Sequence, residues 1–417
     1  MANKAILWFI NNLRLSDNVC LQFAATQKWQ VLPIYILDER LEESAFPEIP
    51  RCGEKRKNWL FANVSSLKQD LQRLGTDLHV QKGNIVQTLN NIIKITGIKT
   101  IITCYEPGSE EESDIAELKQ NSDVNLYVLY DNFLIHPDSL PFTLENLPKV
   151  FTDFRIKIEK NLKEEIFVSS DLPDFISLSE INSEVLNYNE SSDFFKPGKS
   201  GAIARLNYYF FETGLVSTYK ETRNQLLGND FSSHFSPWLA LGVISSQRII
   251  KYLREYENRF GANESTYWLW FELLWRDFFR YQMMKYKNLF FLKNGLSRKQ
   301  VNFKNDISLF KQWMNGKTAE PFVNANMKEL NQTGFMSNRG RQNVASYLIH
   351  DLGIDWRWGA RYFESQLLDY DVSSNWGNWA YIAGVGNDPR PFRKFNITKQ
   401  QEQYDPNGTY INYWINR

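Results

Sequence analysis

The sequence predicts an α/β domain with a parallel, Rossmann-like sheet, followed by a larger all-α domain. Short apolar runs alternate with amphipathic stretches in the first part, whereas the apolar period becomes helical from about Lys196 onward. A length of 417 residues is also too great for one compact core. We therefore expect an α/β domain at 1–130, a connector at 131–195 and a helical domain at 196–417.

Five apolar runs predict the strands of the first domain, and they read AILWF, VLPIYIL, DLHV, TIITCY and NLYVLY. Amphipathic segments such as 18–28 and 54–74 separate these runs and predict helices on the faces of a parallel sheet. The turn after the first run reads INNLRLSDN and lacks a glycine-rich fingerprint, so we do not expect a standard dinucleotide or P-loop site there.

The segment MANKAILWFI predicts a first buried strand rather than a signal sequence, and no apolar run reaches membrane-spanning length. Cys20, Cys52 and Cys104 are too few and too scattered for a disulfide framework or a four-cysteine metal site. We therefore expect a cytoplasmic protein that has no membrane partner and no bound metal.

Segment 161–195 holds eight acidic residues and one lysine among serine, asparagine and proline, and it predicts a connector that is mostly loop. Helical patterns then follow at 203–213, 246–260, 267–286 and 342–352. They predict that the second half of the chain is all-α.

The two halves carry opposite charge, although the formal net charge of the whole chain is zero. Residues 1–195 have a net charge of −10 and residues 196–417 a net charge of +10. A basic half suits a polyanionic partner or an anionic cofactor, because phosphate contacts dominate nucleic-acid affinity. The alternative is a solvated basic surface, and charge alone favours that alternative.

The stretch YWLWFELLWRDFFRY places Glu272, Trp275, Arg276 and Phe279 on one face of a helix. One interpretation is a surface Glu272–Arg276 pair beside a buried aromatic stripe. The other is a pocket wall, in which an aromatic face stacks on a base and a carboxyl group hydrogen-bonds the edge of that base.

The stretch FSSHFSPWLALG places three serines and His234 before Pro237 and an apolar helical run. Such residues cap helices, which needs only one hydroxyl. A cluster of hydroxyls and free amides at a helix start also suits a pyrophosphate. His234 by itself is more typical of an exposed loop.

Two further stretches, MSNRGR and LLDYDVSSN, contain Asn338, Arg341, Asp369, Asp371 and Asn375. The carboxylates could lie in an exposed loop. Buried beside Arg341 instead, one of them could hold a polar heterocycle and tune its protonation. An asparagine both donates and accepts, so Asn375 suits a ring nitrogen that changes protonation with redox state.

The stretch SNWGNWAYIAGVGNDPRPF surrounds bulky aromatics with small residues. Glycine and alanine let a flat ligand, a nucleobase or a crossing helix approach closely. The stretch alone does not distinguish these three possibilities.

Taken together, four segments resemble the DASH branch of the photolyase/cryptochrome family: STYKETRNQLLGNDFSSHFSPWLALG, WFELLWRDFFRY, MSNRGRQNVASYL and GNWAYIAGVGNDPRPFRKFNITKQQEQYDPNGTYI. The resemblance runs from WFINNLRLSDN to YDPNGTYINYW and is weakest in the acidic connector. It implies an α/β antenna domain and a helical domain that binds FAD in a folded, U-shaped conformation.

The resemblance also implies roles for single residues. The FAD phosphates and ribityl chain would lie against Tyr219, Ser232, Ser233, His234, Phe235 and Ser236. The isoalloxazine would be surrounded by Asn338, Arg341, Asp369, Asp371 and Asn375, with Asn375 nearest N5. A flipped-out pyrimidine dimer would meet Glu272, Trp275, Arg276 and Tyr381, of which Glu272 and Arg276 would also contact the cofactor. With Asn375, the residues Glu272, Trp275 and Tyr381 are the expected catalytic group.

In the family's electron relay, Trp379 resembles the first tryptophan and Trp356 the second. Phe303 stands where the family usually has the third, and phenylalanine is much harder to oxidise. We therefore predict weak photoreduction, or a route through another aromatic such as Trp313. In the antenna domain, Glu110 and Arg56 resemble the contacts to a folate, 5,10-methenyltetrahydrofolate, although a glutamate at a strand end is often only solvated.

The activity implied by the resemblance is that of a deoxyribodipyrimidine photo-lyase, which repairs cyclobutane pyrimidine dimers in DNA under blue light. The resemblance also implies a preference for single-stranded DNA. This preference is physically reasonable, because a dimer in a single strand need not be extruded from a duplex, which saves roughly a few kcal/mol of unstacking energy. A photolyase for 6-4 lesions would be expected to have histidines near the flavin, and the MSNRGR segment has none. The resemblance therefore favours cyclobutane dimers as the substrate. The alternative is a blue-light photoreceptor that binds DNA or a protein without repair. We expect a monomer.

Overall fold

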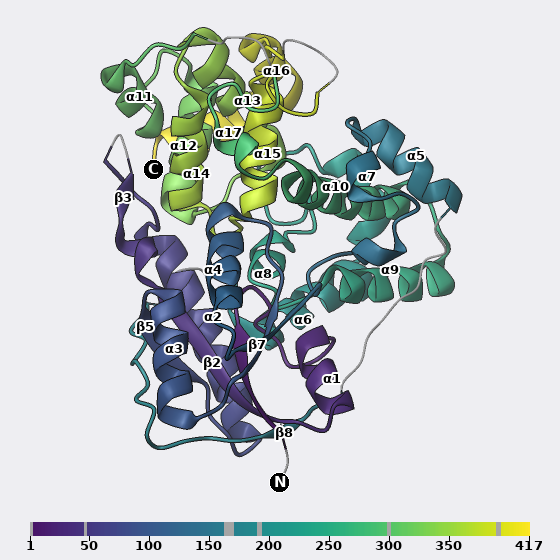
Figure 1. Cartoon of the computed structure of the whole chain (residues 1–417). Coiled ribbons are helices and arrows are strands. Elements are labelled where there is room, and N and C mark those ends of the chain that lie inside the picture. The colour runs from purple at the N-terminus through teal and green to yellow at the C-terminus, as the bar shows by residue number, and fades with distance from the viewer. Residues whose placement is uncertain (1–2, 46–47, 162–170, 190–193, 298–301, 389–392) are drawn as a thin grey trace.

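The computed structural model describes residues 3–45, 48–161, 171–189, 194–297, 302–388 and 393–417. An α/β part contains the N-terminus, and a larger helical part follows it in the chain (Figure 1). The expected fold class is confirmed. The expected boundaries at 130 and 195 remain a prediction.

All strand pairs of the main sheet are parallel, and each of the five predicted runs forms one of its strands. The order along the sheet is β5-β2-β1-β6-β7, and the short β8 pairs with β2. The central strands β1 and β2 are buried almost throughout, because helices cover both faces of the sheet. The strands are β1 (Lys4–Phe9), β2 (Gln30–Asp38), β5 (His79–Gly83), β6 (Thr100–Cys104), β7 (Asn125–Leu129) and β8 (Asp174–Phe175), with a separate antiparallel pair β3 (Ser44–Ala45) and β4 (Ile49–Pro50).

Two of the four helices that connect the strands, α1 and α3, begin at a side-chain cap. Asn18 accepts hydrogen bonds from the first backbone amides of α1, and Asn84 does the same for α3. The left-handed Gly97 ends α3. These helices are α1 (Val19–Thr26), α2 (Glu54–Arg73), α3 (Ile85–Thr96) and α4 (Ser109–Gln120).

The connector contains a helix that the sequence analysis did not predict, α5 (Phe151–Asn161). Its buried side chains Phe151, Phe154 and Ile158 recur at helical spacing. Residues 171–189 contain only the short β8, as expected for a loop-rich connector, whereas 162–170 and 190–193 lie outside the described residues.

The helices predicted from the sequence pattern of the second half are confirmed. The predicted helix 246–260 has these same bounds in α9, and the predicted helices 203–213 and 342–352 correspond to α6 and α13, each continued by a π turn. The helices are α6 (Gly198–Asn207), α7 (Tyr219–Thr222), α8 (Ser236–Ala240), α9 (Ser246–Phe260), α10 (Glu264–Tyr286), α11 (Ile307–Met314), α12 (Pro321–Thr333), α13 (Asn338–Ser346), α14 (Trp356–Gln366), α15 (Val372–Ile382), α16 (Ile397–Tyr404) and α17 (Thr409–Ile415).

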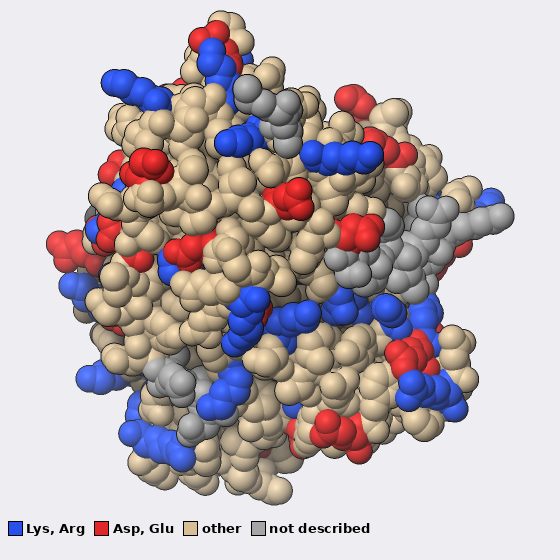
Figure 2. Space-filling model, turned by 90° about the horizontal axis from the view of Figure 1, so that it is seen from below, with Lys and Arg blue, Asp and Glu red and all other residues tan. Residues whose placement is uncertain are grey.

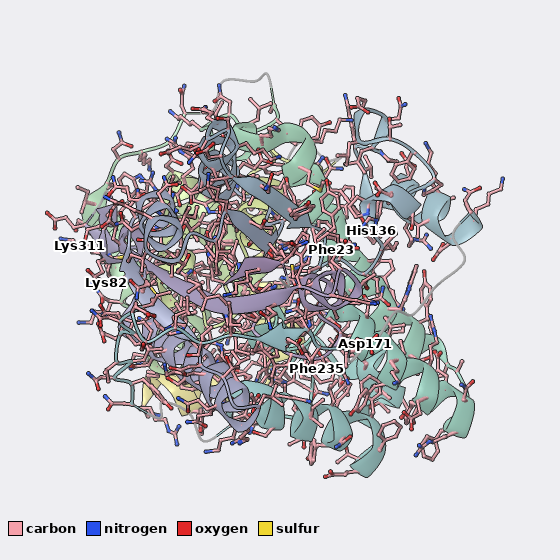
Figure 3. All side chains as sticks on the ribbon, turned by 60° about the horizontal axis from the view of Figure 1, so that its bottom comes forward. Phe23, Lys82, His136, Asp171, Phe235 and Lys311 are labelled. Carbon is pink, nitrogen blue, oxygen red and sulfur yellow. The ribbon has the colours of Figure 1, made fainter. Side chains whose placement is uncertain are left out.

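Buried ion pairs join the α/β part to the helices. Arg280 of α10 pairs with Glu106 at 3.1 Å, just beyond β6, and both side chains are almost fully buried. In Figure 3, Phe235 lies inside the molecule, whereas Lys82 and Lys311 point outward. Seen from the side of the α/β part, Lys and Arg form a row across the middle of the face and acidic groups are scattered around it (Figure 2). Among the described residues, no helix is both long and apolar enough to span a bilayer.

Candidate functional site

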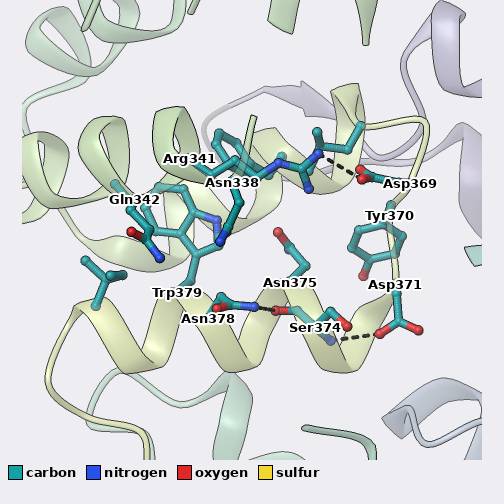
Figure 4. A pocket seen from close by; sticks show the side chains of 14 residues that line it. Asn338, Arg341, Gln342, Asp369, Tyr370, Asp371, Ser374, Asn375, Asn378 and Trp379 are labelled. Carbon is teal, nitrogen blue, oxygen red and sulfur yellow. Dashed lines mark hydrogen bonds and ion pairs between the residues drawn. The ribbon is translucent and has the colours of Figure 1, made fainter. Parts of the chain in front are cut away.

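A cavity of about 530 Å³ lies within the helical part, between α10, α13, α15 and the segment that leads into α8. A narrower pocket of about 100 Å³ continues it along α13 and α15, and shares several of its walls (Figure 4). The predicted residues that line the wide end are Tyr219, Ser232, Ser233, His234, Phe235, Ser236, Glu272, Trp275, Arg276 and Tyr381. Those that line both ends are Asn338, Arg341 and Asp369, and those at the narrow end are Asp371, Asn375 and Trp379.

Asp369 is the centre of a polar cluster at the junction of the two ends. Its Oδ2 accepts hydrogen bonds from Arg341 Nη2 at 2.8 Å and from Ser236 Oγ at 2.6 Å. Its Oδ1 is buried and has no partner among the described residues. A buried carboxylate oxygen without a donor is costly, so this atom is suited to accept a hydrogen bond from a ligand in the cavity.

Asn375 points from α15 into the narrow end (Figure 4). Its Nδ2 donates to the backbone oxygen of Ala360 at 2.9 Å, which fixes the amide and turns Oδ1 toward the cavity. The site therefore offers a fixed acceptor to a ring N–H.

Asp371 holds the start of α15 and two arginines of α10. Its Oδ1 accepts from the backbone amide of Ser374 at 2.8 Å, and its Oδ2 lies 3.4 Å from Arg280 and 3.6 Å from Arg276. Burial alone would raise the pKa of Asp371, but the two guanidiniums outweigh it and lower that pKa. This carboxylate therefore stays charged as part of a structural network at the cavity wall.

The serine segment is shaped from behind by Arg205. Arg205 donates to the carbonyl oxygens of Ser232 and Ser233 at 2.9 and 3.0 Å, so these carbonyls face away from the cavity. The helix behind the segment, α8, has only five residues, so its dipole is weaker than the sequence analysis assumed. A phosphate site here would depend on hydroxyl and loop amide groups.

His234 is buried, and its interpretation as an exposed loop residue was wrong. It adopts a left-handed backbone conformation with φ 55° and packs against Phe231 and Phe335. Burial lowers the pKa of His234 to about 4, so the imidazole is neutral at pH 7.

The surface pair Glu272–Arg276 does not form. Glu272 makes an ion pair with Arg223 instead, and Arg276 donates to the backbone oxygen of Asn132 at 2.8 Å. Burial raises the pKa of Glu272 above its ordinary value, although Arg223 opposes this. Because Glu272 and Arg276 both line the cavity, the structure favours the pocket-wall interpretation of this helix face.

Trp275 and Tyr381 form an aromatic corner at the wide end. Their ring centroids lie 6.0 Å apart, with the planes at 81°. Arg393 lies 4.3 Å above the Tyr381 ring and donates to its hydroxyl at 2.5 Å. Two perpendicular aromatic faces of this kind can stack against flat rings.

Small residues beside the aromatics are explained by close helix packing. A Cβ atom on Gly359 would lie 2.2 Å from the indole of Trp379, and one on Gly377 would lie 2.3 Å from the ring of Phe279. Glycine at these positions lets α14 and α10 approach α15 closely, so Trp379 can lie at the narrow end of the cavity.

Trp356 is fully buried and lies against Trp376, with ring centroids 5.8 Å apart. Trp379 lies against Trp313, at 6.2 Å. Phe303 is only partly buried and packs on the same hydrophobic cluster. The electron relay through Trp379 and Trp356 stays a prediction.

Glu110 and Arg56 line a separate cavity of about 370 Å³ between the α/β part and α14. Glu110 forms two hydrogen bonds with Arg51, one of them at 2.8 Å. Arg56 donates to the backbone oxygen of Glu364 at 2.8 Å and lies 4.3 Å above the ring of Tyr370. No local pattern pointed to Arg51, because it lies 59 residues from Glu110 along the chain.

Sequence reasoning also missed three arginines around the wide end. Arg223 and Arg393 line the cavity, and Arg339 donates to Asn224 Oδ1 on its wall at 3.1 Å. The partners of Arg339 among the described residues are all neutral, and burial lowers its pKa. The excess of basic residues in this half was the available signal, but it did not identify single residues.

Comparisons with known proteins agree with this arrangement. The chain matches the family model described as DNA photolyase over residues 5–173, and the model described as FAD binding domain of DNA photolyase over residues 268–417. A Cryptochrome DASH from Synechocystis sp. is 43% identical, with 98% of this chain and 87% of that protein covered. A Cryptochrome DASH from Xenopus laevis is 41% identical, with 97% and 81% covered.

Solved structures of photolyases and cryptochromes are also similar to this chain. The cryptochrome structure from Synechocystis sp. has a TM-score of 0.91 at 41% identity and covers 100% of this chain and 89% of its own. A class III photolyase from Agrobacterium tumefaciens has a TM-score of 0.85 at 28% identity, with 100% and 87% covered. A photolyase from Sulfolobus tokodaii, described with two FAD molecules, has a TM-score of 0.81 at 25% identity, with 99% and 90% covered.

Proposed function

The chain belongs to the photolyase/cryptochrome family, in its DASH branch, and from this premise we propose that it repairs cyclobutane pyrimidine dimers under blue light. The observation that carries the proposal is the cavity between α10, α13 and α15, whose wide and narrow ends share several walls. Its narrow end has fixed polar groups for a flavin, and its wide end has an aromatic corner for two fused pyrimidines. Preference for single-stranded DNA follows from the unstacking energy that a duplex would cost.

The residues of the cavity fit FAD. The unpartnered Oδ1 of Asp369 would accept a hydrogen bond from the flavin ring, and the Oδ1 of Asn375 would accept one at N5. Ser232 and Ser233 would meet the phosphates through hydroxyl and amide groups. A volume of about 530 Å³ is in the range of cofactor sites.

When bound, reduced FAD would supply the light-driven transfer of one electron to the dimer, and the electron would return afterwards, so that there is no net redox change. The chain binds and orients the two partners. Trp275 and Tyr381 would stack against the dimer, and Glu272 would hydrogen-bond its polar edge. Their enclosure in the cavity would exclude water from the reacting groups.

The arginines at the wide end would bind the DNA backbone. Arg223 and Arg393 line the wide end and Arg339 binds Asn224 on its wall, so the three are suited to contact the phosphates that flank the lesion. Binding should therefore weaken steeply with salt.

A folate is the second proposed chromophore. Glu110 would contact it from the separate cavity, with Arg51 holding the carboxylate and Arg56 on the same wall. The monomeric state and the cytoplasmic location remain predictions.

The test of the proposed function is repair of an oligonucleotide that carries one dimer, as a single strand and as a duplex, by the reduced protein under blue light. We expect repair of the single strand to exceed repair of the duplex, and no repair in the dark. Activity on neither substrate with flavin bound would contradict repair and favour the photoreceptor alternative.

A further inference from the structure

Trp275 is backed by a ring from the connector. The first residue of α5, Phe151, stacks on its indole with ring centroids 3.7 Å apart and planes 11° apart. The other ring neighbours of Trp275 among the described residues lie 5.5 to 6.0 Å away and are tilted or perpendicular to it. The stack with Phe151 is therefore the contact that fixes the plane of the indole.

Phe151 itself has little freedom to move. It is 4% exposed and touches Phe271 of α10 edge to face, at 5.1 Å. Just before it, Gln282 of α10 donates to the backbone oxygen of Pro148 at 2.7 Å. Farther along α5, Arg155 donates to the hydroxyl of Tyr267 at 3.0 Å. The start of α5 is thus fixed relative to the helix that carries Trp275.

The same segment is connected to the support of Tyr381. Asn387 donates from Nδ2 to the backbone oxygen of Lys149 at 3.0 Å and to Gln282 Oε1 at 2.9 Å. The next residue, Asp388, makes an ion pair with Arg393, which holds Tyr381. One framework therefore supports both walls of the aromatic corner from behind.

We propose that Phe151 is a positioning residue of the lesion site: its ring holds the Trp275 indole perpendicular to Tyr381, in the orientation that receives the flipped-out pyrimidine dimer. The inference rests on the proposed function. An indole that is already fixed loses no rotamer freedom when the dimer binds, so its support raises affinity without touching the ligand. The connector then contributes to recognition of the lesion.

The test compares the Phe151→Leu variant with the wild-type protein. Leucine keeps the apolar bulk and removes the flat face. The probe is a fluorescent single strand with one thymine dimer, bound in the dark to the FAD-loaded protein and followed by anisotropy, beside the same strand without damage. We expect Phe151→Leu to weaken dimer binding about three- to tenfold. FAD content and binding of the undamaged strand should not change.

The matched control is Phe154→Leu on the same helix, because Phe154 is also buried but has no ring contact with Trp275. Its ring packs on Phe142, Phe278 and Tyr281, and it reaches the Phe151 ring only at 6.2 Å and tilted, so it does not press on the stacked face. It should bind the dimer as the wild type does. In a Trp275→Leu background, Phe151→Leu should cause no further loss, because its effect acts through the indole.

Three results would overturn the inference. They are unchanged dimer binding by Phe151→Leu, a full additional loss in the Trp275→Leu background, or a loss shared with Phe154→Leu, which would show a structural role only. Equal binding of damaged and undamaged strands by the wild type would overturn the proposed function and this inference with it.

Discussion

Replacing Asp369 with asparagine removes one charge from the cavity and keeps the shape of the side chain. In the wild type, Oδ2 accepts from Arg341 and Ser236, and Oδ1 is left for the cofactor. Asparagine has only one oxygen. Its amide nitrogen must therefore face either the Arg341 guanidinium or the donor of the flavin, and both are donors.

The cost follows from these contacts. The side chain is 3% exposed, so water cannot replace the lost acceptor. A hydrogen bond to a charged group contributes about 1.5–3 kcal/mol, which corresponds to roughly 10- to 150-fold weaker FAD binding. We expect Asp369→Asn to lose FAD within this range and to stay folded.

The assay is titration of the apoprotein with FAD, followed by flavin fluorescence, with circular dichroism as a check on folding. The control is Asp405→Asn, because Asp405 is also buried but accepts from backbone amides at the start of α17, outside the cavity. Its FAD affinity should not change. Wild-type affinity in folded Asp369→Asn would refute the assignment of Asp369 to the cofactor.

Three further predictions concern stability, photoreduction and the antenna. Burial raises the pKa of Glu329 from 4.5 to about 8. Between these two pH values the folded protein keeps a proton that the unfolded chain releases. The free energy of unfolding should therefore fall as pH rises from 4.5 to about 8, by at most about 1.4 kcal/mol per pH unit. Urea unfolding at both ends of the window should show this slope in the wild type and a flatter one in Glu329→Gln; equal slopes would contradict it. Photoreduction of bound flavin, followed by flavin absorbance, should be slow in the wild type, slower still in Trp313→Phe and absent in Trp379→Phe. Fast reduction that needs Trp379 but not Trp313 would exclude the Trp313 route. Glu110→Ala should remove the near-ultraviolet folate band of the purified protein, and an unchanged band would contradict the folate contact.

The sequence predicted the elements whose pattern is local. Each of the five apolar runs forms a strand, and the helix at 246–260 has the predicted bounds in α9. The helix α5 was not predicted, although Phe151, Phe154 and Ile158 show helical spacing. Its pattern stands next to an acidic, loop-like segment, so its apolar face was not recognised.

The site was predictable where one helix face builds it. Helical spacing placed Glu272, Trp275 and Arg276 together, and all three line the cavity. The partner of Glu272 was not predictable, because Arg223 lies 49 residues away, just after the end of α7. Burial of His234 depends on tertiary packing against Phe335, which spacing along the chain does not show.

The central claim is that a flavin and a flipped-out dimer meet in one cavity, and a dark titration tests it most directly. FAD-loaded protein is titrated with a single strand that carries one dimer while the flavin absorption bands are recorded. We predict a change that saturates with the dimer-bearing strand, is absent with the undamaged strand, and disappears under blue light as the dimer splits. Binding of the damaged strand without any change in the flavin bands would contradict the account.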